Sequence, residues 1–305
     1  MRSVVRQAGA RLVVVLGAWA GLAHGMDSNF EKHIAADPHG VVEISNVAGH
    51  VEVQAWDKPE VEVRAQVGGG VERIDTTSDH GRISIKVIVG YRSSEADLHI
   101  HVPRDSELDI SAVSADVVTS EVEGTLQLKT VSGKVKADVF QQNAEVKTLS
   151  GDVDLRGHGK EAGSQEIHVS TVSSNIRIEH AGADLEAITI SGDINVRLDQ
   201  PARHVRIRTT SGALEFNGKL AQGSYFDAES VSGRLSVRAA VVGSLDYEVS
   251  SFSGDIRSCM GGEAERVSQY GPGHRLNGTR GKPGAGEAKV RLKTMSGNIE
   301  LCDKT

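Results

Sequence analysis

The chain has 305 residues, of which 34 are Lys or Arg and 41 are Asp or Glu, so its net charge is −7 with His neutral. An acidic chain is a poor candidate for binding nucleic acid or anionic lipid, because both require a basic surface. Aromatic residues make up only 4% of the chain. The core therefore has to be built from Val, Ile, Leu, Ala and Thr, a composition typical of β-structure.

Residues 1–25 have the pattern of an export signal. Basic residues precede an apolar run at 12–22, and Ala23-His24-Gly25 supplies small residues at the two positions that a signal peptidase reads. The run is too short to span a bilayer, and no cysteine follows it as a site for a lipid anchor. We therefore expect a mature chain that begins near Met26, has no membrane span, and lives in the periplasm or on the cell surface.

Residues 26–110 contain short runs of alternating apolar and polar residues, a pattern that indicates strands with one buried face. No fixed period separates these strands, and turn-forming segments such as Asp57-Lys58-Pro59 and Gly68-Gly69-Gly70 lie between them. The runs lie at 41–45, 51–54, 61–65, 82–89 and 98–102.

From residue 111 onward a four-residue phrase returns: a hydroxyl residue, a usually apolar residue, then Ser-Gly. Its copies begin at Thr130, Thr148, Thr189, Thr209, Ser230, Ser251 and Thr294, and degenerate copies carry Ala115 and Ser174 in the Gly position. Most copies are about 20 residues apart, which indicates one structural unit stacked many times. Apolar residues alternate on both sides of each Ser-Gly, so each copy predicts two strands joined at a tight corner.

The pattern therefore predicts an all-β protein: a single-stack β-solenoid, similar to a parallel β-helix, over 111–305. We interpret 26–110 as an irregular N-terminal β cap with the first rungs, continuous with the rod, because an uncapped terminal rung would recruit another chain. The Gly-rich stretch 261–286 is expected to be a hairpin or loop inserted before the final rung. The predicted turn residues are Ser132, Gly133, Ser150, Gly151, Asp152, Ser191, Gly192, Asp193, Ser253, Gly254, Asp255, Ser296 and Gly297.

The repeated serines do not predict a nucleophile, because a catalytic site needs one residue made different from its copies. An Asp follows the Gly position at Asp116, Asp152, Asp193 and Asp255, and such a row could bind Ca²⁺ or a basic surface. Other residues interrupt the row, so the turn preference of Asp and Asn explains it better. We predict no catalytic residue and no cofactor.

Cys259 and Cys302 each lie five residues after the Gly of their own copy. Equivalent positions on adjacent rungs are about 4.8 Å apart, within the reach of a disulfide. An exported chain favours such a bond, which would tie off the inserted loop and the last rung at the C-terminal end. Without a Cys-x-x-Cys motif or clustered His, the two thiols make a poor zinc site.

Two other groups of residues are candidates for contacts. Tyr270, His274 and Arg275 gather aromatic and basic character in the inserted loop, which could contact a partner or simply connect two strands. His99 and His101 lie on one face of a strand, a spacing that suits a metal, but with no third ligand evident we interpret them as surface histidines. No metal site is predicted.

These residues resemble those of the bacterial putative adhesin family, exported proteins whose domain has repeated Ser-Gly-Asp turns. The resemblance covers nearly the whole mature chain. It rests on Ile44-Ser45-Asn46 with Gly49, Ala55-Trp56-Asp57, Val102-Pro103 and the copies up to Ser296-Gly297-Asn298-Ile299. The family implies a β-solenoid and an envelope location, and it has no catalytic motif to carry over. The chain departs from the family pattern at Ala115, Ser174 and Ala213.

We therefore expect an exported, non-enzymatic scaffold whose partner is an envelope protein or a glycan. One alternative is a polysaccharide lyase or hydrolase, since other β-helices cleave acidic glycans; Arg177, Arg197, Arg206 and Arg208 would be its nearest basic patch. Another alternative is a periplasmic partner in envelope stress sensing.

Overall fold

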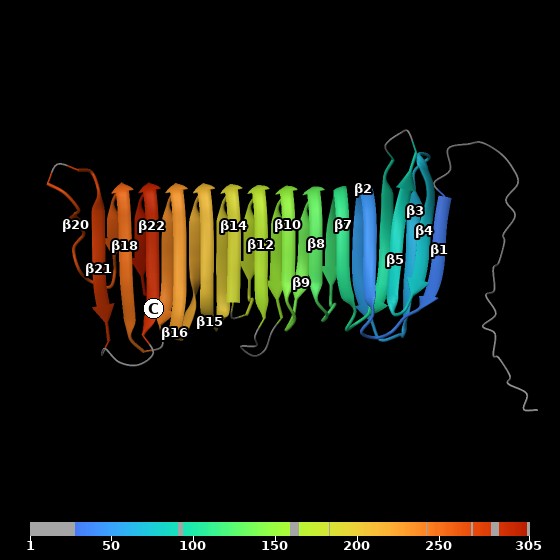
Figure 1. Ribbon diagram of the computed structural model, residues 1–305, viewed down its shortest axis with the longest axis horizontal. Helices are drawn as coiled ribbons and strands as arrows, with labels where there is room; N and C mark the ends of the chain where they lie inside the picture. Colours follow the sequence, from blue (N-terminus) through green and yellow to red (C-terminus); the bar gives the residue numbers. More distant parts are fainter. Residues whose placement is uncertain are drawn as a thin grey trace, which may run out of the picture.

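The computed structural model describes residues 28–90, 94–158, 165–182, 184–241, 243–269, 271–281 and 287–303, and the predicted export signal lies outside them. All secondary-structure elements in this part of the chain are strands, and they stack side by side into one long rod (Figure 1). The predicted all-β, single-stack solenoid is confirmed. The rod has two sheets built mainly of parallel strands. We call them sheet A, which contains the strands before the Ser-Gly corner, and sheet B, which contains the strands after it.

In the middle of the rod each rung is one strand of sheet A followed by one strand of sheet B. Sheet A contains β8 (Leu126–Ser132), β10 (Ala144–Ser150), β12 (Glu166–Ser173) and β14 (Asp184–Ser191); sheet B contains β9 (Val135–Val139), β11 (Val153–Gly157) and β13 (Ile176–Glu179). Four strands belong to both sheets, namely β2 (Val41–Trp56), β7 (Glu107–Ser120), β15 (Ile194–Ser211) and β16 (Leu214–Ser232). Pairing is parallel and in register, as where Val146 pairs with Leu128 and with Val169. Alternate side chains point inward, so the core is a continuous column of Val, Ile, Leu and Ala.

The corner requires glycine for two reasons that act together. Gly133 has a φ of +119°, a backbone conformation that side-chain-bearing residues rarely adopt, and a Cβ there would lie 2.2 Å from the carbonyl oxygen of Ala115 on the preceding rung. The other corner glycines share this arrangement, with contacts of 1.9 to 2.1 Å at Gly151, Gly192, Gly212, Gly233, Gly254 and Gly297. The backbones of neighbouring rungs therefore leave no room for a Cβ along this edge.

At the N-terminal end the rungs do not follow chain order. The outermost rung is formed by β5 (Arg82–Val89) and β6 (Ala96–Pro103), and β2 (Val41–Trp56) lies between that rung and β7. Antiparallel strands then close both sheets. On sheet A, β4 (Val71–Asp79) covers β5; on sheet B, β3 (Glu60–Val67) covers β6, and β1 (Ser28–Ala35) covers β3.

The C-terminal end repeats this inversion. The last rung of the chain, β22 (Ala288–Ser296) with β23 (Ile299–Cys302), lies between the rung of β16 and β17 (Leu235–Val241) and the rung of β18 (Leu245–Ser253) and β19 (Ile256–Ser258) (Figure 1). The expectation that the final rung ends the stack is therefore wrong. Within the inserted segment, β20 (Glu265–Arg266) and β21 (His274–Arg280) form a hairpin, and β21 runs antiparallel along β18 as a closing strand.

The charges on the outer face of sheet A explain why the last rung is inserted there. β16 presents Asp227 and Glu229, and β18 presents Glu248. The basic strand β22 separates them, so that Arg291 pairs with Asp227 on one side and with Glu248 on the other. A hydrogen bond with Tyr225 and the charge of Asp227 raise the pKa of Arg291. If β16 and β18 were neighbours in the same register, carboxylates would face each other, which destabilises a sheet.

We expect Arg291→Glu to lower the free energy of unfolding by about 1 to 2 kcal/mol, because it creates three acidic strands in a row. The loss should be measured by urea unfolding followed by circular dichroism. The control is the double variant Arg291→Glu/Glu248→Arg, which restores an opposite charge on one side and should recover part of the loss. Equal stability of Arg291→Glu and the wild type would show that charge does not maintain this order.

Candidate interaction surface

A file of exposed apolar side chains runs along the corner edge of the rod. Large apolar residues on a protein surface are normally scattered one by one. Here the same position of the rung holds an apolar side chain, 37 to 56% exposed, in eight of nine successive rungs. In spatial order they are Val113, Val131, Leu149, Val172, Ile190, then Val231, Met295 and Phe252 after an interruption at Thr210. We call this file the apolar ridge, and at about 4.8 Å per rung it is about 38 Å long.

The corner itself forces these side chains outward. The residue just before each ridge residue is buried, and it is a Thr or Ser at every ridge position except Val113, which follows Ala112. Some of these hydroxyls donate to a corner carbonyl: Thr130 Oγ1 to the oxygen of Ser132 at 3.0 Å and Thr148 Oγ1 to that of Ser150 at 3.2 Å. Since successive side chains of a strand alternate in direction, the residue after a buried Thr has to face solvent. The apolar character of the ridge is therefore not needed for the core.

The Asp and Asn residues after the corner form backbone hydrogen bonds between rungs. Asp116 accepts from the N–H of Lys134 at 2.7 Å, and Asp152 accepts from the N–H of Asn175 at 3.2 Å. Asp193 likewise accepts from the N–H of Ala213 at 2.8 Å. These side chains cap N–H groups at the turn, which accounts for their presence without a bound cation.

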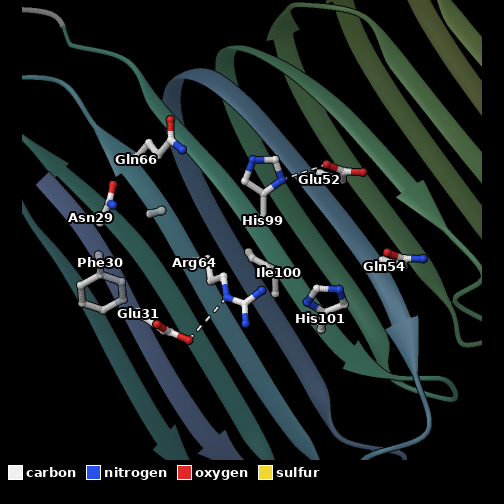
Figure 2. Close-up of a pocket in the computed structure, with 11 residues that line it drawn as sticks. Asn29, Phe30, Glu31, Glu52, Gln54, Arg64, Gln66, His99, Ile100 and His101 are labelled. Carbon is white, nitrogen blue, oxygen red and sulfur yellow. Dashed lines mark hydrogen bonds and ion pairs between the residues drawn. The ribbon is translucent and has the colours of Figure 1, made fainter. Parts of the chain in front are cut away.

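A second polar region lies on the outer face of sheet B at the N-terminal end. A pocket of about 430 Å³ lies there, and Figure 2 shows the charged side chains that line it on neighbouring strands. Arg64 lies between Glu31 of β1 and His99 of β6, and His99 Nδ1 lies 2.9 Å from a carboxylate oxygen of Glu52 on β2. Acidic side chains on the two outer strands thus flank Arg64 and His99 on the two strands between them.

One of the two predicted surface histidines, His101, lies beside a buried carboxylate that was not predicted from the sequence. Glu62 is 4% exposed, and its oxygens lie 3.0 Å from His101 Nδ1 and 3.4 Å from His33 Nε2. Glu31, His33 and Glu62 bring their ligand atoms close enough for a metal ion. However, Arg64 Nη2 lies 2.7 Å from the same Glu62 oxygen, so a cation already holds this carboxylate. We interpret the group as a charge network.

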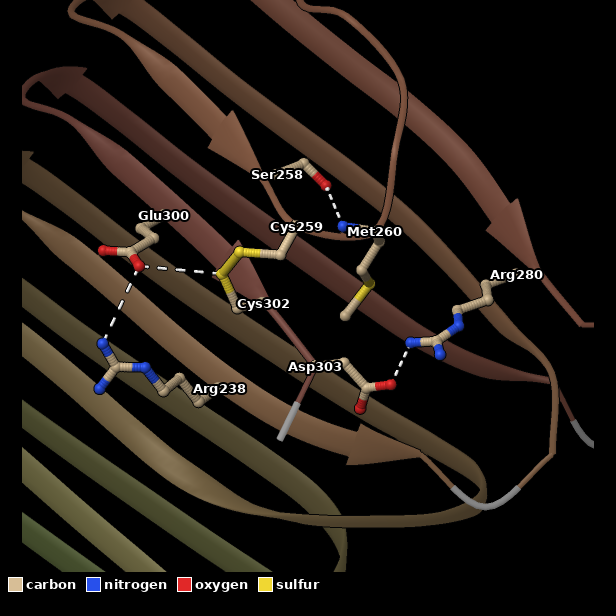
Figure 3. Close-up of a disulfide and its surroundings, with 8 residues drawn as sticks. All are labelled: Arg238, Ser258, Cys259, Met260, Arg280, Glu300, Cys302 and Asp303. Atoms are coloured by element: carbon tan, nitrogen blue, oxygen red, sulfur yellow. Dashed lines mark hydrogen bonds and ion pairs between the residues drawn. A yellow bond between two sulfur atoms is a disulfide. The ribbon is translucent and has the colours of Figure 1, made fainter. Parts of the chain in front are cut away.

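The predicted disulfide between Cys259 and Cys302 is confirmed (Figure 3). Cys302 pairs in register with Arg238 on one side of β23, and Cys259 follows β19 on the other side. The two Cα atoms are 4.7 Å apart, as expected for equivalent positions of adjacent rungs. The bond joins the inserted rung to the outermost rung, so it does not tie off a final rung at the end of the stack.

Of the three predicted contact residues in the inserted segment, the structure describes two. Tyr270 lies outside the described residues. His274 and Arg275 lie in β21, where they pair with Ser251 and Ser250 of β18. They therefore belong to the closing strand and not to a free connecting loop.

The four arginines considered as a basic patch lie on different sheets. Arg177 and Arg197 are in sheet B, where Arg177 Nε lies 3.5 Å from a carboxylate oxygen of Asp154. Arg206 and Arg208 are in sheet A, and each lies within 3.8 Å of at least one carboxylate on a neighbouring strand: Glu186 for Arg206, and Asp227 and Glu229 for Arg208. The arrangement therefore provides no single basic groove for an acidic glycan.

Comparison with protein families agrees with this architecture. The family model described as Toastrack DUF4097 matches residues 41–241 and again 204–302, and so covers most of the chain. The chain belongs to the Toastrack DUF4097 family. The resemblance to the putative adhesin family is thereby confirmed. A search of curated proteins found no match.

Solved structures similar to this Toastrack chain include three described as adhesion proteins. A putative adhesin from Bacteroides fragilis is 11% identical with a TM-score of 0.43, covering 90% of this chain and 97% of that one. A putative adhesin from Parabacteroides distasonis is 13% identical with a TM-score of 0.32, covering 91% and 98%. A putative cell adhesion protein from Clostridium sporogenes is 9% identical with a TM-score of 0.21, covering 92% and 100%. Likenesses this distant carry no argument about binding.

The described residues of this Toastrack chain include no helix long and apolar enough to cross a membrane. The apolar ridge was not among the predicted site residues. Its signal is visible in the sequence as the usually apolar residue of each repeated phrase, but only the corner geometry shows that this residue faces outward.

Proposed function

We propose that this protein is an exported, non-enzymatic scaffold of the bacterial envelope that binds a protein partner along the apolar ridge. The observation that carries the proposal is the ridge itself: eight half-exposed apolar side chains aligned over nine rungs. Exposed apolar patches of such extent mark interaction sites, because leaving them in water is unfavourable. The export signal predicted at residues 1–25 and the disulfide support a location outside the cytoplasm.

The shape of the rod favours display over catalysis. The corner serines pair with one another in register from rung to rung, and Asp116, Asp152 and Asp193 are engaged in capping turns. Arg177, Arg206 and Arg208 lie beside carboxylates of neighbouring strands. Catalysis on a glycan requires carboxylates set apart in a groove, whereas the ridge is an apolar edge suited to another protein surface.

The test is site-specific photocrosslinking in cells that produce the full chain. A photoreactive amino acid replaces Leu149 on the ridge or, as control, Lys136, which is exposed on the outer face of sheet B. We expect crosslinked products from position 149 and few or none from position 136. Equal crosslinking from both positions, or none from either, would contradict the proposal.

The non-enzymatic part of the proposal has its own measurement. Purified mature protein is incubated with acidic and neutral polysaccharides and with peptidoglycan, and new chain ends are counted. We expect none to be released. Release of ends from any substrate would overturn this part and return attention to the carboxylates of the rod.

A further inference from the structure

The two sides of the apolar ridge carry opposite charge. On the sheet A side, the exposed residue three positions before the corner Ser is a cation in four rungs and a carboxylate in one. This basic flank consists of Lys129, Lys147, Arg208, Lys293 and the acidic exception Glu229. On the sheet B side, the residue after the corner glycine is a carboxylate in four rungs and a cation in two. This acidic flank consists of Asp116, Asp152, Asp193, Asp255 and the basic exceptions Lys134 and Arg234.

We propose that the ridge binds a second copy of this chain, edge to edge, with the two rods parallel and in register. This inference rests on the proposed function and names the partner of the same surface. A straight edge that repeats every 4.8 Å over nine rungs is matched along its whole length by a surface with the same repeat, and another copy of the rod has that repeat.

Charge decides the direction of pairing. In a parallel dimer, whose twofold axis runs along the rods, the basic flank of one copy faces the acidic flank of the other. In an antiparallel dimer, whose twofold axis is perpendicular to the rods, the basic flank would face the basic flank of the other copy and the acidic flank would face the acidic flank. Opposite charges across an interface favour association, and like charges disfavour it. The parallel arrangement is therefore the complementary one.

Two of the three in-register pairs in which both flank residues are charged agree with this choice. In a parallel dimer Lys147 faces Asp152 of the other copy, and Glu229 faces Arg234. Within one chain Lys147 contacts Glu145, and Glu229 lies 3.4 Å from Arg208, so the dimer would extend existing ion pairs. One rung opposes the arrangement, since Lys129 would face Lys134 of the other copy.

The ridge residues meet their own counterparts in such a dimer, which gives a sharp test. In a parallel dimer Val113 of one copy lies beside Val113 of the other, and Phe252 beside Phe252. In an antiparallel dimer centred on the ridge, Val113 would lie beside Phe252. Cysteine substitution at these exposed ends therefore distinguishes the two directions.

The experiment uses purified mature protein with the native disulfide intact. Under mild oxidation we expect Val113→Cys alone and Phe252→Cys alone to form covalent dimers, and Lys136→Cys on sheet B to remain monomeric. Crosslinks that form only when the Val113→Cys and Phe252→Cys proteins are mixed would overturn the parallel direction.

Sedimentation equilibrium measures the association without crosslinking. We expect the wild type to form a dimer within a concentration range that extends to about 100 µM. The double variant Leu149→Ser/Ile190→Ser should raise the dissociation constant of this dimer roughly a hundredfold. Because both side chains face solvent, circular dichroism should show an unchanged fold. A wild type that stays monomeric overturns the inference. If it is monomeric while position 149 still crosslinks to other proteins in cells, the proposed function stands and the self-association fails; if neither occurs, both fail.

Discussion

Replacing Gly133 with Ala is expected to lower the free energy of unfolding by about 4 kcal/mol or more. A Cβ at this position would lie 2.2 Å from the carbonyl oxygen of Ala115, and the φ of +119° is itself unfavourable for Ala. Relief would require neighbouring rungs to separate along the corner edge, which breaks the in-register pairing of both sheets. Urea unfolding followed by circular dichroism measures the loss.

Gly243→Ala provides the matched control. Its φ of +108° is close to that of Gly133, but a Cβ there meets nothing within 4 Å. We therefore expect a cost of about 1 to 2 kcal/mol from backbone conformation alone. If the two variants lose the same stability, the stacking of carbonyls against the corner is not what demands glycine.

Removing the disulfide by Cys259→Ser/Cys302→Ser is expected to destabilise the C-terminal end by about 4 kcal/mol, the loop-closure entropy for a separation of 43 residues. Each rung of a rod contacts only its neighbours, so the loss should be local. The outer rung of β18 and β19, with the closing strand β21, should open while the middle rungs persist.

Hydrogen exchange followed by mass spectrometry measures this effect along the chain. We expect faster exchange over 245–258 and 274–280 in the variant, and unchanged exchange over 126–155 as the internal control. Uniformly faster exchange along the whole rod would instead mean that the disulfide stabilises all rungs as one cooperative unit.

The regular part of the rod could be predicted from the sequence because its signals are local. Each copy of the phrase places a buried Thr, an exposed residue and a corner glycine within four positions, as in Thr148-Leu149-Ser150-Gly151. The alternating residues on either side then indicate strands with one buried face. The pairing of Cys259 with Cys302 followed from the same count, because both lie five residues after their corner glycine.

The polar network at the N-terminal end could not be predicted from residue spacing. Glu62 contacts His33 and His101 across the pairing of β1, β3 and β6, three strands without a common repeat. Nothing local to Glu62 distinguishes a buried, hydrogen-bonded carboxylate from an ordinary exposed one. The contacts of Glu62 depend on the order of the strands, and the sequence of the antiparallel closing strands has no repeat from which that order could be predicted.

The sequence by itself determined the rung, the corner and the covalent link, since each depends on residues at fixed spacing within repeated copies. Only the tertiary structure decided the positions of the rungs at both ends. These depend on pairings between distant segments, such as β2 with β7 and Asp227 of β16 with Arg291 of β22. The physical reason is that any two rungs of this repeat can stack, so the choice among them is left to long-range charge and edge closure.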